Sequence, residues 1–266
     1  MRMKALSATI RLPLFSSKLP VPYQVAISSP LPLSSALIGS LVRAMAIAGL
    51  IEPKGENIEE VSSAGVEYLL SELYCATSRL IECGSRGTVV LKRHRGLEHI
   101  IRSDAMRREY IFGQKAEIIY LFREGRVLED AYSAIPLLDR IGDTESLVSP
   151  INWNIYDVKV VEDVEVELNT VTRASFIEKI QEGAFSVVKA YLTPIFKCGE
   201  WMWPSSPIAD SFYVPIRAVT ISREGLTLLE PSTLKVKLAR GCKVAEFESS
   251  AGIARVAFPK NPVWVG

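Results

Sequence analysis

Histidine and cysteine, the usual protein ligands of zinc, are scarce in this sequence. There are two histidines and four cysteines, and the cysteines lie far apart, at Cys75, Cys83, Cys198 and Cys242. None of them forms a C-x-x-C pair, so no zinc-binding pattern is present. A Walker loop, a G-x-S-x-G elbow, a dinucleotide fingerprint and an H-E-x-x-H motif are also missing. We therefore expect no metal and no cofactor, and the simplest interpretation is a cytoplasmic protein with reduced thiols.

A surplus of charge of either sign is missing as well. The chain has 31 Lys and Arg against 30 Asp and Glu, which gives a net charge of +1. A nucleic-acid partner would therefore have to be sought in the distribution of charge, because it leaves no mark on the total. Apolar residues make up 48% of the chain and no low-complexity run interrupts them, so we expect it to fold throughout. Glutamine and asparagine are few, which fits a heat-adapted, thermophilic source.

The sequence has one long apolar run, at residues 36–48, and it is too short to cross a bilayer, which takes about 20 residues. We expect no membrane association and interpret the run as a buried core helix. Pro30 and Pro32 hold the chain before it extended. Ser34 or Ser35 is expected to cap the start of the helix by accepting bonds from its free N–H groups, and Gly49 is expected to end it.

The remaining pattern is helical in the first half and rich in strands in the second. We predict strands at residues 3–12, 88–91 and 117–122, one defective helix or two short ones at 56–76, and a short helix at 127–139. Five further strands are predicted at 186–193, 212–222, 234–238, 244–247 and 253–258. This balance suits an α+β fold, with a ferredoxin-like (RRM-like) domain in residues 1–150 and a smaller β-rich part in residues 151–266 that completes it.

The most basic stretch runs from residue 86 to residue 108 and has a local net charge of about +5, enough to attract a phosphate backbone. Its cations are Arg86, Lys92, Arg93, Arg95, Arg102, Arg107 and Arg108, joined by His94 and His99 and opposed only by Glu98 and Asp104. Arginine grips phosphate with two parallel bonds and stacks on unpaired bases. Tyr110 and Phe112 follow directly and could offer stacking surfaces. The alternative is a solvated loop whose charges serve solubility alone.

Three further segments are candidates for contacts with RNA or with proteins. The helix start at Ser34 and Ser35 could hold a phosphate on its free N–H groups, although the serines could equally well only cap the helix. In the segment RIGDTES, residues 140–146, Arg140 suits RNA, whereas Asp143 and Glu145 suit a structural or subunit-docking role because acids repel phosphate. Trp201 and Trp203 could dock a partner protein or pin their loop to its own core.

The order strand, proline-rich approach, then a helix beginning P-x-S-S-x-x-x-G resembles the N-terminal motif of the RAMP proteins of CRISPR systems. The matching residues are Pro30, Pro32, Ser34, Ser35 and Gly39. In particular the motif is similar to that of the fifth-numbered Cas family, the Cascade subunit that holds the 5′ handle of the guide RNA (crRNA). The segment RIGDTES, about 100 residues further on, resembles one found in the archaeal type I-A branch of that family.

The resemblance implies a RAMP domain whose basic insertion, about residues 86–115, forms a thumb that clasps guide RNA. It also implies a non-catalytic subunit of a Cascade surveillance complex in antiviral defence, which caps the crRNA 5′ handle beside a backbone RAMP subunit, a large subunit and a small subunit, and meets target DNA only indirectly. Two alternatives stay open. The first is a metal-independent endoribonuclease that processes precursor RNA with His94, His99, Lys92 and Tyr110. The second is a scaffold subunit that contacts only proteins.

Overall fold

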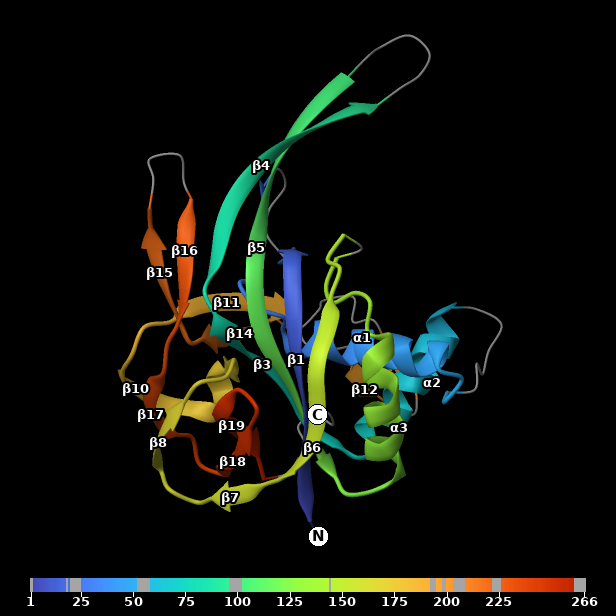
Figure 1. Cartoon of the computed structure of the whole chain (residues 1–266), viewed down its shortest axis with the longest axis vertical. Helices are drawn as coiled ribbons and strands as arrows, with labels where there is room; N and C mark the ends of the chain where they lie inside the picture. The colour runs from blue at the N-terminus through green and yellow to red at the C-terminus, as the bar shows by residue number, and fades with distance from the viewer. Residues whose placement is uncertain are drawn as a thin grey trace.

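The structure is a computed structural model. It describes residues 2–17, 19, 25–51, 58–95, 102–143, 145–191, 195–197, 200–202, 209–221 and 226–260. The described residues form mostly antiparallel sheets and three α-helices, and the predicted α+β class is confirmed at this level (Figure 1). Among the described strand pairs only β2 with β5 is parallel.

The central sheet is built on one long strand, β5 (Arg102–Arg123). The sheet runs in the order β15 (Ile216–Thr220), β16 (Thr227–Pro231), β4 (Gly84–Arg95), β5, β1 (Met3–Phe15) and β6 (Ser149–Asp157). Two more strands also pair with β5, the short β2 (Val25–Ala26) and β3 (Leu73–Glu82). Strands from both sides of residue 150 therefore share one sheet. The predicted strands at 88–91 and 117–122 are short pieces of β4 and β5.

The helices α1 (Ser34–Ile47), α2 (Ile58–Leu70) and α3 (Arg126–Ala134) belong to the main hydrophobic core, which lies on one face of this sheet. A 3₁₀-helix, η1 (Ile135–Leu137), which contains Pro136, follows α3 within the range predicted as one helix. The core joins Leu37, Ile38 and Leu41 of α1 to Leu6 and Ile10 of β1. The expected burial of α1 is only partly right, because Gly39, Arg43 and Ala46 are exposed and Ile47 is 55% exposed.

The two ends of α1 test the expected caps. Gly49 adopts a φ of 70°, its N–H donates to the carbonyl of Ala46, and the N–H of Leu50 donates to Met45, both at 3.0 Å. This is a Schellman end, so the predicted stop is confirmed. The serine cap is wrong: Leu33 is the N-cap residue, and no side chain caps the helix. Ser34 already lies inside the helix, and its hydroxyl donates instead to the Ala76 carbonyl of β3 at 2.7 Å.

The predicted helix at residues 56–76 is too long. Its last residues belong to β3, which the sequence did not indicate as a strand. Gly65 is the point where α2 approaches α1. A Cβ there would lie 2.6 Å from Cγ1 of Val42 and 3.2 Å from Cδ1 of Ile51, so only glycine fits without a shift.

The opposite face of the central sheet is covered by a three-stranded sheet of β7 (Lys159–Val161), β18 (Cys242–Ser249) and β19 (Gly252–Pro259). A second hydrophobic cluster joins Ala5, Ile119 and Leu121 to this sheet through Phe247 and Phe258. The remaining strands form three small sheets. These are β10 (Ile177–Glu182) with β17 (Leu234–Leu238) and β8 (Glu165–Leu168), then β11 (Ser186–Tyr191) with β14 (Ala209–Val214) and β9 (Thr172–Arg173), then β12 (Ile195–Lys197) with β13 (Glu200–Met202). The 3₁₀-helix η2 (Ala174–Phe176) precedes β10.

A buried ion pair holds the covering sheet in place. Arg79 of β3 and Glu117 of β5 are 6% and 0% exposed, and Nε of the arginine lies 2.5 Å from the carboxylate, which also accepts from Ser7. The rest of the guanidinium donates to the carbonyls of Gly252 and Ile253 at the β18–β19 turn, at 2.9 and 2.5 Å. Every charge in the cluster therefore has a partner, which burial of charge requires.

Arg79→Ala should destabilise the protein by about 3–5 kcal/mol, because it leaves the carboxylate of Glu117 buried without a counter-charge. The double variant Arg79→Met/Glu117→Leu should lose clearly less than the sum of the two single changes. Urea unfolding monitored by circular dichroism measures these free energies. The control is Lys237→Ala, which removes an exposed pair with Glu178 and should cost under about 1 kcal/mol. Equal losses in the buried and exposed variants would contradict this account of the ion pair.

Candidate functional site

The most basic segment of the chain forms an arm, which we define as β4 together with residues 102–112 of β5. The two strands pair from Ser85 opposite Phe112 to Arg95 opposite Arg102. Figure 1 shows them curving away from the helices and the lower sheets as a long ribbon. At the base of the arm Gly113 has a φ of 64°, at the point where β5 changes its partner from β4 to β3. The arm is thus a continuation of the core sheet.

Two of the predicted RNA-binding arginines have side chains that are free of ion pairs. Arg107 lies opposite Val90 and is exposed, and Arg86 lies opposite Ile111 and is half-buried. In the part of the chain that the structure describes, neither of them has an acidic partner. Successive residues of a strand alternate between its two faces, so Arg86 and Arg107 lie on the same face of the arm. Arg107 is therefore available to a phosphate and Arg86 partly so, although Glu109 lies between them on the same face and accepts from the N–H of Ser28.

The other predicted cations lie further out. Residues Lys92, Arg93, His94 and Arg95 belong to the outer half of β4, where the register pairs them with residues 105 to 102 of β5. His99, which the nuclease alternative needs, lies outside the described residues. The arm therefore brings the basic stretch together on one two-stranded element, with Arg86 near its base.

Arg108, also predicted to bind RNA, is held inside the protein. Its side chain is only 13% exposed, and its guanidinium lies 2.6 Å from Asp143 and 3.1 Å from Glu145. It also lies over the ring of Tyr110, 5.2 Å from the ring centre. These contacts leave Arg108 little freedom to contact RNA, although it is adjacent in sequence to Arg107.

Tyr110, predicted to stack on RNA or to act in cleavage, belongs to the same cluster. It is buried, and its hydroxyl donates to Glu145 at 2.9 Å. Burial and this hydrogen bond raise the pKa of the Tyr110 hydroxyl above its usual value. A phenol of raised pKa with its proton held by a carboxylate is a poor proton acceptor at neutral pH.

The segment at residues 140–146 braces the base of the arm against the end of β1. Gly142 has a φ of 92°, and a Cβ there would lie 2.8 Å from the carbonyl oxygen of Ser16. The N–H of Asp143 and the hydroxyl of Ser146 both donate to that oxygen, at 2.9 and 2.7 Å. Asp143 and Glu145, predicted as docking residues, are thus engaged within the chain. Arg140 is exposed and lies 3.8 Å from Asp139.

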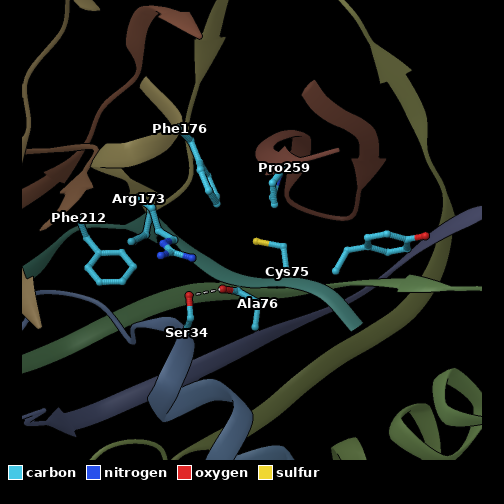
Figure 2. A pocket seen from close by; sticks show the side chains of 9 residues that line it. Ser34, Cys75, Ala76, Arg173, Phe176, Phe212 and Pro259 are labelled. Atoms are coloured by element: carbon cyan, nitrogen blue, oxygen red, sulfur yellow. Dashed lines mark hydrogen bonds between the residues drawn. The ribbon is translucent and has the colours of Figure 1, made fainter. Parts of the chain in front are cut away.

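The start of α1 faces a small pocket, shown in Figure 2, which is lined by residues that include Ser34, Cys75, Arg173, Phe176 and Phe212. Its volume is about 20 Å³, which is room for one water molecule. A phosphate group does not fit this pocket. Ser35 is half-buried at the same helix end. This pocket is therefore too small to serve as the predicted anion site at Ser34 and Ser35.

The two predicted tryptophans are only partly placed. Trp201 lies in β13, where the register pairs it with Phe196. Trp203 lies outside the described residues. Ser16 could not be singled out from the sequence because no motif surrounds it, and Arg79 and Glu117 looked like ordinary strand charges. Nothing in the sequence indicated that β15 and β16 extend the arm's sheet.

Within the described ranges, no group of three or more His, Cys, Asp or Glu residues is placed to hold a metal ion. The described helices include none of the length and apolarity needed to cross a membrane.

Comparison with known proteins identifies the family. No protein-family model matches the chain. A CRISPR-associated protein Cas5 of Methanocaldococcus jannaschii is 32% identical over 203 residues, which cover 74% of this chain and 80% of the relative. The chain belongs to the Cas5 family of CRISPR-associated proteins. A second archaeal Cas5, from Thermoproteus tenax, is 34% identical over 146 residues, 53% of this chain and 62% of that protein. The resemblance found in the sequence is confirmed.

One solved structure supports the fold, and a second is similar in coverage alone. A CRISPR protein from Archaeoglobus fulgidus matches with a TM-score of 0.56 at 14% identity, over 96% of this chain and 99% of that one. A chain titled CRISPR RNA-guided surveillance complex matches with a TM-score of 0.44 at 13% identity, over 88% of this Cas5 chain and 89% of its own length.

The pocket at α1 allows a test of the local environment in this Cas5 protein. The Sγ atom of Cys75 points into the pocket (Figure 2), and burial raises the pKa of its thiol to about 12. The thiolate is the reactive form, so at pH 8 Cys75 should react with iodoacetamide at least about a hundredfold more slowly than the exposed Cys83. Peptide mass mapping over time measures both rates, and a urea-unfolded sample is the control. Equal rates in the native protein would contradict the buried setting of Cys75.

Proposed function

We propose that this Cas5 chain is a non-catalytic RNA-binding subunit of a type I-A CRISPR surveillance complex of the Cascade kind, and that it caps the 5′ handle of crRNA. The observation that carries the proposal is the arm, with Arg86 and Arg107 unpaired on one of its faces. Four further cations stand toward its outer end in the sequence. A backbone RAMP subunit, a large subunit and a small subunit are its proposed partners in the complex.

The core topology supports a ferredoxin-like RAMP domain as the base of this arm. Four strands of the central sheet lie side by side as β3, β5, β1 and β6. The chain passes through α1 and α2 between β1 and β3, and through α3 between β5 and β6. This is the β-α-β-β-α-β order of ferredoxin-like folds, with an extra helix in the first connection. In chain order the arm lies between β3 and the core half of β5, and it then corresponds to a long hairpin that extends the second and third strands of that fold.

The chemistry of the arm favours single-stranded RNA. Phosphate contacts from arginine need side chains that are not already neutralised, and single strands carry one charge for each nucleotide. An extended ribbon can follow such a backbone. Handle sequence would be recognised on unstacked bases, which proteins hold by stacking and by hydrogen bonds to the base edges.

Cleavage is the less favoured proposal. It needs one group that takes the proton of a 2′-hydroxyl and another that protonates the leaving oxygen. Tyr110, one of the four candidate groups, has its hydroxyl bonded to Glu145 and its pKa raised. His94, His99 and Lys92 would then have to act without it. We propose that they contact phosphate.

Arg107→Gln should weaken binding of a guide RNA with the repeat-derived 5′ tag. It should also reduce the slope of log K against log salt by about 0.7, since one phosphate contact of a single strand is lost. The matched control is Arg123→Gln, an exposed arginine at the far end of the same strand. Fluorescence anisotropy over a series of salt concentrations measures affinity and slope. Equal slopes for wild type and both variants would favour the protein-only scaffold.

The same titration separates handle capping from general RNA binding and from cleavage. RNA with the tag scrambled should bind more weakly than tagged RNA, and a denaturing gel should show both intact. Cut product that disappears in a His94→Ala/His99→Ala variant would establish the endoribonuclease instead. Equal binding of the two RNAs would contradict recognition of the handle.

A further inference from the structure

Beside the arm, the central sheet ends in an uncovered strand. β15 pairs with β16, which in turn pairs with the base of β4. Within the described part of the chain no strand pairs with the other side of β15. Figure 1 shows the β15–β16 hairpin standing beside the arm, with β15 outermost. An edge strand presents unpaired N–H and C=O groups that invite another strand.

The register shows which backbone groups these are. The N–H of Ile221 donates to the carbonyl of Leu226, and that of Ser232 donates to the carbonyl of Pro215, so these two pairs are hydrogen-bonded across the hairpin. In an antiparallel ladder bonded and non-bonded pairs alternate. Ala218 and Thr220 therefore belong to non-bonded pairs, opposite Leu229 and Thr227, and their own N–H and C=O groups point away from β16. Both residues are exposed.

The side chains next to this edge are apolar. Val219 and Ile221 are 41% and 58% exposed, and Leu226, across the hairpin from Ile221, is 41% exposed. The surface continues onto the arm at Gly87, where a Cβ would lie 3.9 Å from Leu226 and 3.3 Å from the ring of Phe112. We call the residues Val219, Ile221, Leu226, Gly87 and Phe112 the apolar hairpin face.

This face offers little to a phosphate. By the alternation of each strand it is the side of the sheet opposite to Arg86 and Arg107. Of the arginines on this side, Arg217 stands directly across from Glu230 and Arg108 is paired with Asp143 and Glu145, whereas Arg93, Arg95 and Arg102 lie further out along the arm. A polypeptide fits it better than RNA, because an extended chain supplies matching backbone groups and apolar side chains.

The opposite edge of the sheet is protected in the ways natural edge strands are. β6 contains Pro150, which has no N–H, and its pairing with β1 is interrupted by a register shift there. Its exposed residues include Asn152, Asn154 and Asp157. β15 has neither proline nor register shift, and its outward positions are alanine and threonine. The contrast indicates that the β15 edge is used.

We propose that the β15 edge takes an extended, largely apolar segment of a neighbouring protein subunit, which adds a strand to the central sheet beside Ala218 and Thr220. This partner contact rests on the proposed function, because it requires that the chain works in a multi-subunit complex. RNA and protein would then bind at separate places. RNA would lie on the face of the arm that carries Arg86 and Arg107, and the protein segment would lie at the β15 edge.

Thr220→Pro tests this directly, because it removes an outward N–H that β16 does not use, and proline is tolerated at such edge positions. The matched control is Thr220→Val, which keeps the N–H. In complexes assembled from the chain, the backbone, large and small subunits and tagged guide RNA, native mass spectrometry should show loss of at least about tenfold in retention of one protein subunit with proline and none with valine. Ile221→Lys, at an already exposed position, gives a second variant if the proline variant folds poorly.

Hydrogen exchange of the wild-type chain supplies an independent reading. The amides of Ala218 and Thr220 should exchange fast in the isolated chain and at least about tenfold more slowly in the complex. Amides that stay fast, or variants that assemble like wild type, would overturn the proposal. So would protection by RNA alone, or an isolated dimer that Thr220→Pro dissociates, since the occupant would then be RNA or a second copy. Failure of RNA binding with protected amides would sink the proposed function and leave this inference standing.

Discussion

A single strand, β5, has to satisfy two environments, and the rest of the molecule is arranged around that constraint. Its second half lies between β1 and β3 in the core, with Ile118, Tyr120 and Phe122 fully buried. Its first half leaves the core with β4 and forms the arm. Because one continuous backbone ladder joins the two, the arm is oriented by the same hydrogen bonds that hold the core. The buried Glu117–Arg79 pair then anchors the covering sheet of β7, β18 and β19 to the same strand.

Most of the described acidic side chains outside the arm form an ion pair with a basic side chain. Glu162 pairs with Lys243, Glu178 with Lys237 and Asp157 with Lys4. At the base of the arm Asp143 and Glu145 occupy Arg108. Among the described side chains of the arm, Arg86 and Arg107 are left without an acidic partner, while Glu109, between them, accepts only from the N–H of Ser28. A chain of net charge +1 can therefore still present a local positive field, because pairing elsewhere removes the acids that would cancel it.

The sequence predicted α1 and its end at Gly49, because an apolar run and a glycine that ends a helix determine structure through neighbouring residues alone. They failed where distant contacts decide. Residues 73–76 fall inside the predicted helix at 56–76, yet they begin β3 because β5 offers that strand an edge. Ser34 was expected to cap, yet a strand carbonyl lies within reach of its hydroxyl. In the site, the basic stretch was recognisable from composition, but Arg107 and Arg108 look identical in sequence. Only the fold places Asp143 and Glu145, 35 and 37 residues away, beside one of them and not the other.

The separation of Arg107 from Arg108 lets the arm keep a free cation for the proposed RNA contact while it stays attached to its core. Adjacent residues of a strand face opposite sides, so one arginine can be exposed while its neighbour holds the 140–146 segment against β1. If both were free, the base of the arm would lose the bonds that Arg108 makes to Asp143, Glu145 and Ser16. If both were paired, Arg86 would be the one described cation left free on that face. Because side chains alternate along a β-strand, Arg107 can remain free for the proposed RNA contact while Arg108 supports the base of the arm.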